Sequence, residues 1–251
     1  MDSVRRAKTV FLFLALVAGF AAGHFTADVS AIRDVTAIRW LQESGLSAAR
    51  GISQARGLDS NEAHPERRGQ FDLFPRHGDV VMVGDSITQA GMWDDMFPDV
   101  RIVNRGLGSD RTDDVLGRMP SILNVRARKA FVMLGVNDFS AGRTVSEVFN
   151  DYVRIVDMLK SRGASVVIQS TIECNVESLG LCAGFLPKIR ELNLRLGEYA
   201  LRSNVTFIDI NAGITSPREG LLAPFTSDGV HLSAKGYNHW REKISPLVYA
   251  R

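Results

Sequence analysis

Residues 79–83 (DVVMV) form an apolar, β-branched run that leads directly into the pentapeptide GDSIT at positions 84–88. Four further runs of this kind recur along the chain, at 100–103 (VRIV), 130–134 (AFVML), 165–169 (SVVIQ) and 205–208 (VTFI). Near-continuous apolar strands indicate a sheet that is buried on both faces, which is typical of parallel sheets.

Segments with apolar residues at helical spacing lie between or after these strands, at 110–119, 145–162, 187–202 and about 233–247. The alternation predicts an α/β protein in which a five-stranded parallel sheet is the middle layer of a three-layer α/β/α sandwich. In such a sheet, functional side chains gather at the carboxyl ends of the strands. The motifs that directly follow the strands are therefore the candidates for chemistry.

The amino terminus has a different character. Residues 9–25 (TVFLFLALVAGFAAGHF) carry no charged side chain and follow Arg5, Arg6 and Lys8. A basic segment followed by an apolar run of this length is typical of an export signal or a single membrane anchor. We therefore expect residues 1–25 to be a signal peptide or an anchor, and the rest of the chain to be periplasmic, secreted or anchored outside the cytoplasm. An uncleaved segment would contact the membrane.

Residues 26–70 are expected to connect this segment to a catalytic domain at 71–251, through a short amphipathic helix at 30–42 and a polar linker. Acidic and basic residues are mixed along the chain, and the formal net charge is only +2. This pattern argues against a nucleic-acid partner, which would favour a basic stripe.

Cys174 and Cys182 enclose the short segment CNVESLGLC. In an oxidising compartment they could close a small loop, and the alternative is two free thiols, because spacing alone does not determine pairing. Their spacing is not that of a zinc site and no histidine lies near them in sequence. We therefore expect no metal at this segment.

Ser86 directly follows the first predicted strand, where its hydroxyl would face the crevice. By itself a serine here could simply cap a helix. Asp228 and His231, three residues apart before the last predicted helix, supply a possible base. The carboxylate can hold the Nδ1–H of the imidazole while Nε2 faces a serine hydroxyl.

Acyl transfer also needs donors for the oxyanion that forms on the attacked carbonyl. Asn137, in GVND after the third strand, offers a side-chain amide. The turn NRGLGSDRT at 104–112 follows the second strand and offers backbone N–H groups, among them those of Gly108 and Ser109. Each motif alone also has a structural reading, as a turn brace or a tight bend. Their occurrence together at several strand ends favours a catalytic site.

GDSIT, NRGLGSDRT, GVND and DGVH, in this order, resemble the signature blocks of the SGNH (GDSL) hydrolase family of serine esterases over residues 71–249. The resemblance implies a flavodoxin-like fold, hydrolysis of acyl esters, and no metal or organic cofactor. It also implies that Ser86 is the nucleophile and the first oxyanion donor and that Asn137 is a second donor. Asp228 and His231 would complete the catalytic triad.

One position departs from the family pattern. The family usually has glycine as the middle oxyanion donor, where this chain has Ser109 after Gly108. The required backbone N–H is still present in serine. If the geometry demands a positive φ, serine is strained there in a way that glycine is not.

These features predict a serine esterase. The resemblance, with its NRG-type second block, further implies a short, acetyl-type acyl ester on a carbohydrate or a related small molecule. The same site could serve a polysaccharide O-acyltransferase outside the cytoplasm, a lysophospholipase or a thioesterase. A non-catalytic binding module on the same fold is a further alternative, although binding alone does not require a serine, a histidine and a carboxylate together. The sequence makes no prediction of the oligomeric state.

Overall fold

The structure is a computed structural model that describes residues 65–250. The predictions for residues 1–25 and for most of the connecting region lie outside the described residues. Within residues 65–250, every helix is too short or too polar to cross a membrane.

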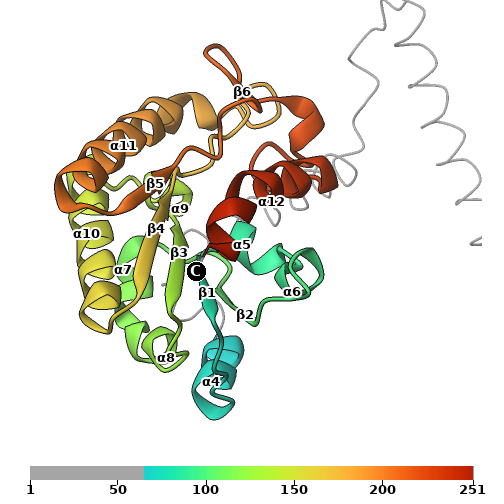
Figure 1. Ribbon diagram of the computed structural model, residues 1–251. Coiled ribbons are helices and arrows are strands. Elements are labelled where there is room, and N and C mark those ends of the chain that lie inside the picture. The colour runs from blue at the N-terminus through green and yellow to red at the C-terminus, as the bar shows by residue number, and fades with distance from the viewer. Residues whose placement is uncertain (1–64, 251) are drawn as a thin grey trace, which may run out of the picture. The chain divides into compact units, whose positions relative to one another are not determined.

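The centre of the domain is a parallel sheet with the strand order β2-β1-β3-β4-β5, as Figure 1 shows. Its strands are β1 (Val80–Gly84), β2 (Ile102–Gly106), β3 (Lys129–Met133), β4 (Ser165–Gln169) and β5 (Thr206–Ile208). All five residues of β1 are buried, as expected for a central strand covered on both faces. The predicted five-stranded parallel sheet is confirmed, and its order is the flavodoxin-like one.

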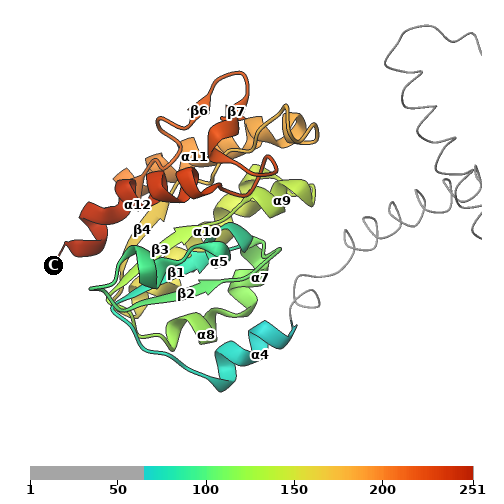
Figure 2. The ribbon, with the colours of Figure 1, turned by 90° about the vertical axis from the view of Figure 1, so that its right-hand side faces the viewer.

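Helices cover both faces of the sheet (Figures 1 and 2). One face carries α7 (Thr112–Gly117), α8 (Met119–Leu123), α10 (Val145–Ser161) and α11 (Cys182–Ser203). The other carries α5 (Ser86–Ala90), α6 (Trp93–Met96) and α12 (Ala234–Tyr249). The smaller elements are α4 (Pro65–Leu73), α9 (Val136–Ser140), a 3-10 turn η2 (Ala223–Phe225) and the hairpin of β6 (Thr215–Ser216) and β7 (Gly220–Leu221). The layers confirm the predicted α/β/α sandwich.

Local sequence explains why α10 forms where it does. Thr144 caps its amino terminus by accepting from the N–H of Glu147, whose carboxylate accepts in return from the Thr144 N–H, a capping box. Its buried side chains recur every three or four residues and face the sheet: Val148, Tyr152, Ile155, Val156 and Leu159. The Tyr152 hydroxyl donates to the Val132 carbonyl at 2.7 Å, so the one polar group of this face is satisfied.

The strand β2 begins and ends later in the chain than the sequence predicts. It was expected at 100–103, but the strand is Ile102–Gly106 and includes Asn104. The Asn104 amide donates to the Gln89 carbonyl at 3.0 Å, and its oxygen accepts from the Gly106 N–H at 2.8 Å. A polar residue is tolerated in this edge strand because its side chain has partners that the local sequence does not reveal.

Two helix predictions also needed correction. The helix predicted at 110–119 is two helices, because the backbone leaves the helical conformation at Arg118 before α8 begins. α11 begins at Cys182 rather than at Pro187, which lies inside it. Proline is most often found in the first turn of a helix, which is why it suggested a start.

The predicted end of the linker, at Gln70, falls within α4, so residues 65–70 are helical. α4 buries none of its residues fully. It is held to the domain by the Phe71 ring, whose centroid lies 4.6 Å from the Arg105 guanidinium, and by Arg68, which donates to the Gly117 carbonyl at 2.8 Å. Because these contacts are with residues distant in sequence, the local sequence does not reveal them. Its polar composition therefore predicted a linker.

Candidate active site

The carboxyl ends of β1, β2 and β3 lie side by side. Gly84, the last residue of β1, is in register with Gly106 of β2 and with Met133 of β3. The Leu107 N–H donates to the Gly84 carbonyl at 3.0 Å, so the turn after β2 is tied directly to the end of β1. The motifs that follow these strands therefore share one edge of the sheet.

Ser86 is the first residue of α5 and is separated from the end of β1 by Asp85 alone. Asp85 caps this helix, because its Oδ1 accepts from the Ile87 N–H at 2.9 Å. The Ser86 N–H has no acceptor within the helix, as is usual in a first turn, and it is free to face a ligand. The Ser86 Oγ lies 2.9 Å from the His231 Nε2, across 145 positions of sequence.

The other ring nitrogen of His231 faces Asp228. The distance from Nδ1 to Oδ2 is 2.7 Å, and an ionised carboxylate can only accept, so Nδ1 carries the proton and Nε2 is left to accept from the Ser86 hydroxyl. The other oxygen, Oδ1, accepts from the N–H groups of Val230 and His231 at 2.9 and 2.8 Å. The structure thus brings the three predicted residues together in one hydrogen-bonded series.

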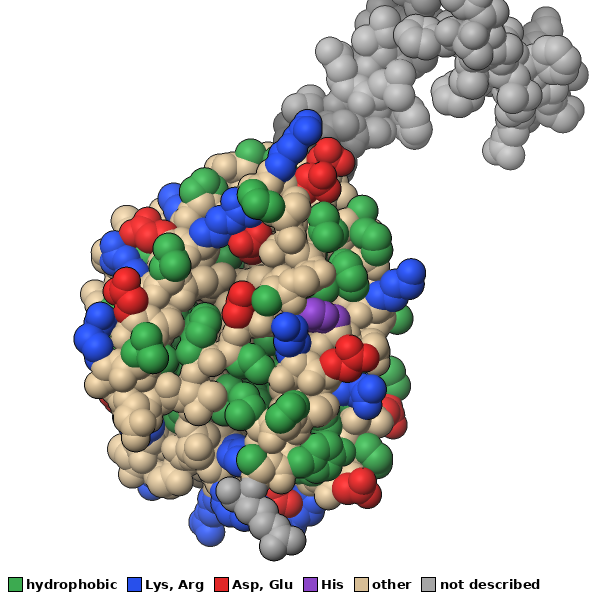
Figure 3. Space-filling view, turned by 45° about the horizontal axis from the view of Figure 1, so that its top comes forward, with side chains coloured by type: hydrophobic (Ala, Val, Ile, Leu, Met, Phe, Trp, Pro, Cys, Tyr) green, Lys and Arg blue, Asp and Glu red, His purple; other side chains and the backbone are tan. Residues whose placement is uncertain are grey.

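Partial burial alone would raise the pKa of the Asp228 carboxyl. Hydrogen bonds from the His231 ring and from the backbone N–H groups of His231 and Val230 outweigh this effect and hold the pKa below its ordinary value. The carboxylate is therefore ionised throughout the neutral range and orients the imidazole. The site is open, with the side chains of His231 and Asp228 43% and 53% exposed. Figure 3 shows a face of the molecule on which acidic, basic and hydrophobic side chains are interspersed.

Two of the candidate oxyanion donors are available for a ligand. The Asn137 amide donates one hydrogen to the Asp110 carbonyl at 3.0 Å, which orients it and leaves its second hydrogen unused. The N–H of Ser109 has no hydrogen-bond acceptor among residues 65–250. Gly108 differs, because its N–H already donates to the Gln89 Oε1 at 2.8 Å. We therefore exclude Gly108 as an oxyanion donor, and its bond to Gln89 instead shapes the turn.

Ser109 adopts a φ of 64°, in the left-handed region that glycine tolerates best. Strain was expected if the geometry demanded a positive φ here, and the structure shows that it does. The Ser109 side chain is exposed and makes no hydrogen bond among the described residues.

We expect Ser109→Gly to raise the free energy of unfolding by up to about 1 kcal/mol, because the strain disappears while the loss of backbone entropy on folding offsets part of the gain. Ser109→Ala retains the strained φ and should leave stability within about 0.5 kcal/mol of the parent. Urea unfolding of both variants measures the difference. Equal stability of the two would show that the turn stores no strain.

The sequence interpretation missed the buried residue that joins the two segments with candidate oxyanion donors, the turn at 104–112 and GVND at 135–138. Asp138 is fully buried, and its Oδ1 accepts from the Thr112 hydroxyl at 2.7 Å and from the Arg143 guanidinium at 2.6 Å. Burial raises its pKa to about 6, against the opposing effect of these partners. Asp138 directly follows Asn137, so its position was visible, but its partners across the sheet edge were not.

Asp85 and Asp110 are also buried carboxyls beneath the site. Burial raises the pKa of Asp110 to about 6, although Arg118 lies 2.6 Å away and opposes the shift. Complete burial raises the pKa of Asp85 to about 7, despite the hydrogen bond from Ile87. Among the described residues, the Oδ2 of Asp85 has no partner, which agrees with a carboxyl that resists ionisation.

The raised pKa of Asp85 predicts how stability depends on pH. The folded state keeps a proton that the unfolded state has already released, so this stabilisation is fully present below about pH 4 and is lost as pH rises through about 7. Between pH 5.5 and 8 the parent should lose about 2 kcal/mol more than Asp85→Asn does. Urea unfolding at both pH values tests this, with the exposed Asp99→Asn as control. If Asp85→Asn lost as much stability as the parent between pH 5.5 and 8, the pH dependence would not come from Asp85.

The parallel sheet and the series Ser86, His231 and Asp228 at its carboxyl edge define a class, that of serine hydrolases built on an α/β/α sandwich. The chain belongs to the GDSL-like lipase/acylhydrolase family, whose family model matches residues 82–239. It is therefore an acylhydrolase, a carboxylic ester hydrolase.

Characterised relatives are distant. The platelet-activating factor acetylhydrolase IB subunit alpha2 of Rattus norvegicus is 25% identical over 194 residues, which cover 70% of this chain and 79% of the relative. An N-acylneuraminate cytidylyltransferase of Streptococcus agalactiae is 25% identical over 167 residues, 66% of this chain and 38% of the relative. The chain thus spans less than half the length of that cytidylyltransferase.

Solved structures share the fold. A GDSL-like lipase of Bacteroides thetaiotaomicron superposes with a TM-score of 0.63 at 19% identity, covering 74% of this chain and 95% of its own. An acetylxylan esterase of Geobacillus stearothermophilus superposes with a TM-score of 0.58 at 14% identity, covering 71% and 97% of the two chains. At these identities the likeness concerns the fold alone.

Proposed function

We propose that this chain is a serine esterase that acts outside the cytoplasm and removes a short, acetyl-type acyl group from a carbohydrate or a related small ester. The observation that carries the serine mechanism is the continuous series from the Ser86 Oγ to His231 at 2.9 Å and from His231 to Asp228 at 2.7 Å. A serine hydroxyl becomes a nucleophile when a positioned base takes its proton in this way.

In this mechanism the Ser86 Oγ forms a bond to the ester carbonyl carbon while its proton passes to the His231 Nε2. The carbonyl oxygen becomes an oxyanion and accepts from the N–H groups of Ser86 and Ser109 and from the Asn137 amide. The tetrahedral intermediate then expels the alcohol, which takes the proton from His231 and leaves an acyl-enzyme. Water attacks the acyl-enzyme by the same route, which releases the acid and restores the serine.

The openness of the site supports a bulky alcohol part. Because the side chains of His231 and Asp228 are about half exposed, a sugar can approach the base from solvent without entering a tunnel. The names of two similar proteins, an acetylhydrolase and an acetylxylan esterase, also refer to acetyl esters. The exposed Ser109 hydroxyl adds a polar group beside the oxyanion donors.

The disulfide supports a location outside the cytoplasm. Cys174 and Cys182 are joined, with their Cα atoms 5.9 Å apart, so the paired alternative of the sequence interpretation holds. Disulfides persist in oxidising compartments and are rare in the cytosol. The basic and apolar segment at 1–25 agrees with export or anchoring.

A substrate panel tests the proposed substrate class. The purified chain is assayed on nitrophenyl esters from acetyl to long acyl groups and on acetylated xylan oligosaccharides, with Ser86→Ala as the blank. We expect the highest kcat/KM on acetyl esters and release of acetate from the oligosaccharides. Activity that rises steadily with acyl length would instead favour a lipid esterase. Transfer of acetyl to an added sugar in preference to water would favour the acyltransferase.

A further inference from the structure

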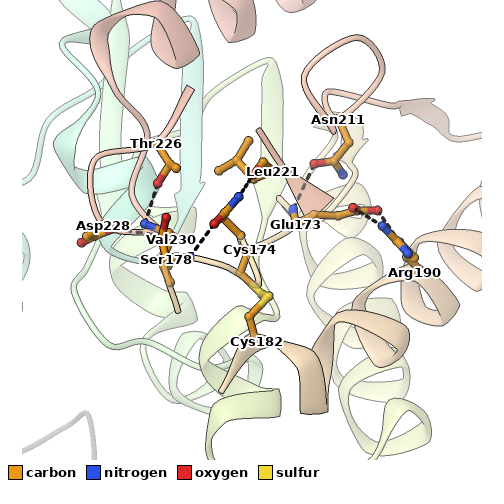
Figure 4. The surroundings of a disulfide bond; sticks show 12 residues. Glu173, Cys174, Ser178, Cys182, Arg190, Asn211, Leu221, Thr226, Asp228 and Val230 are labelled. Carbon is orange, nitrogen blue, oxygen red and sulfur yellow. Dashed lines mark hydrogen bonds and ion pairs between the residues drawn. A yellow bond between two sulfur atoms is a disulfide. The ribbon is translucent and has the colours of Figure 1, made fainter. Parts of the chain in front are cut away.

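The segment closed by the Cys174–Cys182 disulfide packs against the segment that carries the catalytic histidine. We call residues 174–182 the disulfide loop and residues 226–231 the histidine loop. Figure 4 shows the two segments beside one another, with Ser178 next to Asp228 and Val230. Their chain positions are distant, so this contact exists only in the folded protein.

One hydrogen bond joins the two loops at their backbones. The Asn175 N–H donates to the Gly229 carbonyl at 2.7 Å. Within residues 65–250, this is the hydrogen bond that links the backbone of the histidine loop to a distant segment, since its other backbone bonds run to residues 223–233. The disulfide loop therefore anchors the backbone of the histidine loop from outside.

The packing at this contact is too tight for a side chain unless the neighbouring residues shift. Gly229 has a φ of 92°, and a Cβ added to it would lie 3.0 Å from the Ser178 Cβ and 3.1 Å from the Leu179 Cβ. Both distances are shorter than ordinary van der Waals contact. The histidine loop thus follows the surface of the disulfide loop closely, and a shift of one would displace the other.

The disulfide loop is rigid enough to act as such a support. Its Cys174 and Cys182 ends are both buried, and the disulfide joins them to each other. Inside the loop, the Asn175 Oδ1 accepts from the Ser178 N–H at 2.6 Å, and its amide donates to the Leu221 carbonyl at 2.6 Å. The loop is therefore tied at its ends, across its turn and to β7.

Two hydrogen bonds connect Gly229 to the backbone of His231. The Gly229 N–H donates to the Thr226 Oγ1, and this hydroxyl donates to the His231 carbonyl, both at 2.8 Å. We propose that the disulfide loop is a positioning element for catalysis, which holds Gly229 and thereby keeps the His231 imidazole within reach of the Ser86 hydroxyl. The inference rests on the proposed serine mechanism and adds to it a role for Cys174 and Cys182.

Three variants of the full chain test this role. Cys174→Ala with Cys182→Ala opens the support, and Gly229→Ala pushes the loops apart while the disulfide stays intact. Gly163→Ala is the matched control, because Gly163 also has a positive φ, 82°, but a Cβ there meets no atom within 4 Å. Each variant is assayed below its unfolding transition for kcat and KM on nitrophenyl acetate and for the rate of Ser86 labelling by a fluorophosphonate.

We expect the cysteine pair variant and Gly229→Ala to lower kcat and the labelling rate by about 10- to 100-fold, with KM within about threefold, because a displacement near 1 Å is enough for such losses. Gly163→Ala should lose stability through its positive φ alone and keep the parental kcat. The low-field proton NMR signal of the Asp228–His231 hydrogen bond should broaden or shift in the first two variants only. A merely structural role would lower the unfolding temperature and move neither kcat nor this signal.

Combining the changes separates loop contact from local backbone strain at Gly229. In the cysteine pair background the disulfide loop can yield, so adding Gly229→Ala should lower kcat by less than it does in the parent. The positioning role would be overturned if Gly229→Ala lowered kcat by the same factor in both backgrounds, or if the cysteine pair variant kept the parental kcat. Either result would leave the proposed function intact. Absence of Ser86 labelling in the parent itself would overturn the proposed function, and the positioning role with it.

Discussion

Replacing Ser86 with alanine is expected to lower ester hydrolysis by about 10⁶-fold, because the change removes the atom that attacks the carbonyl. The fold should be unaffected. The Ser86 Oγ forms a hydrogen bond with the His231 Nε2. Because the His231 side chain is 43% exposed, water can take the place of the serine hydroxyl. The free energy of unfolding should stay within about 0.5 kcal/mol of the parent.

The measurement pairs steady-state hydrolysis of nitrophenyl acetate with fluorophosphonate labelling, followed by mass spectrometry of the labelled peptide. The parent should carry one label on Ser86, and Ser86→Ala should carry none. Ser165→Ala is the control, since this exposed serine begins β4 at the opposite edge of the sheet. Labelling of neither parent nor variant would favour a non-catalytic binding module.

Asp228→Asn is expected to lower kcat by about 10⁴-fold, through the tautomer of His231 rather than through the shape of the site. The asparagine oxygen can still accept from the N–H groups of Val230 and His231, so the loop geometry is retained. Its amide would then face the His231 Nδ1 as a donor. The imidazole would place its proton on Nε2, where it could no longer accept from Ser86.

Kinetics at several pH values check this expectation. In the parent, hydrogen bonding holds the pKa of Asp228 below its ordinary value, so its contribution is present at neutral pH and is lost only as pH falls through that lowered pKa. Loss of kcat in Asp228→Asn should therefore persist across the neutral and alkaline range. Asp99→Asn, an exposed carboxylate elsewhere, serves as the control. More than a tenth of the parental kcat in Asp228→Asn would show that the carboxylate does not orient the base.

The strands and the motifs that follow them could be predicted because their signals are local. A strand that is buried on both faces appears in the sequence as a continuous apolar run. The motifs GDSIT, GVND and DGVH each lie next to a predicted strand or helix. For this reason the sequence alone predicts the parallel sheet and supplies Ser86, Asn137, Asp228 and His231 as candidate site residues.

The errors arose where a distant partner decides the local structure. Asn104 could join β2 because α5 supplies acceptors for its amide. Gly108 was a plausible oxyanion donor until Gln89 proved to occupy its N–H. None of these partners is visible in a sequence window, since spacing along the chain does not determine spatial proximity.

The sequence by itself therefore determined the fold class and the residues that can carry the chemistry. Tertiary structure alone decided how those residues are held. Asp138 accepts from Thr112 and Arg143 beneath the candidate oxyanion donors, and Asn175 donates to the Gly229 carbonyl two residues before His231. The physical reason is that periodicity and motifs record local preferences, whereas hydrogen bonds between distant loops form only after the sheet has brought the ends of its strands to one edge.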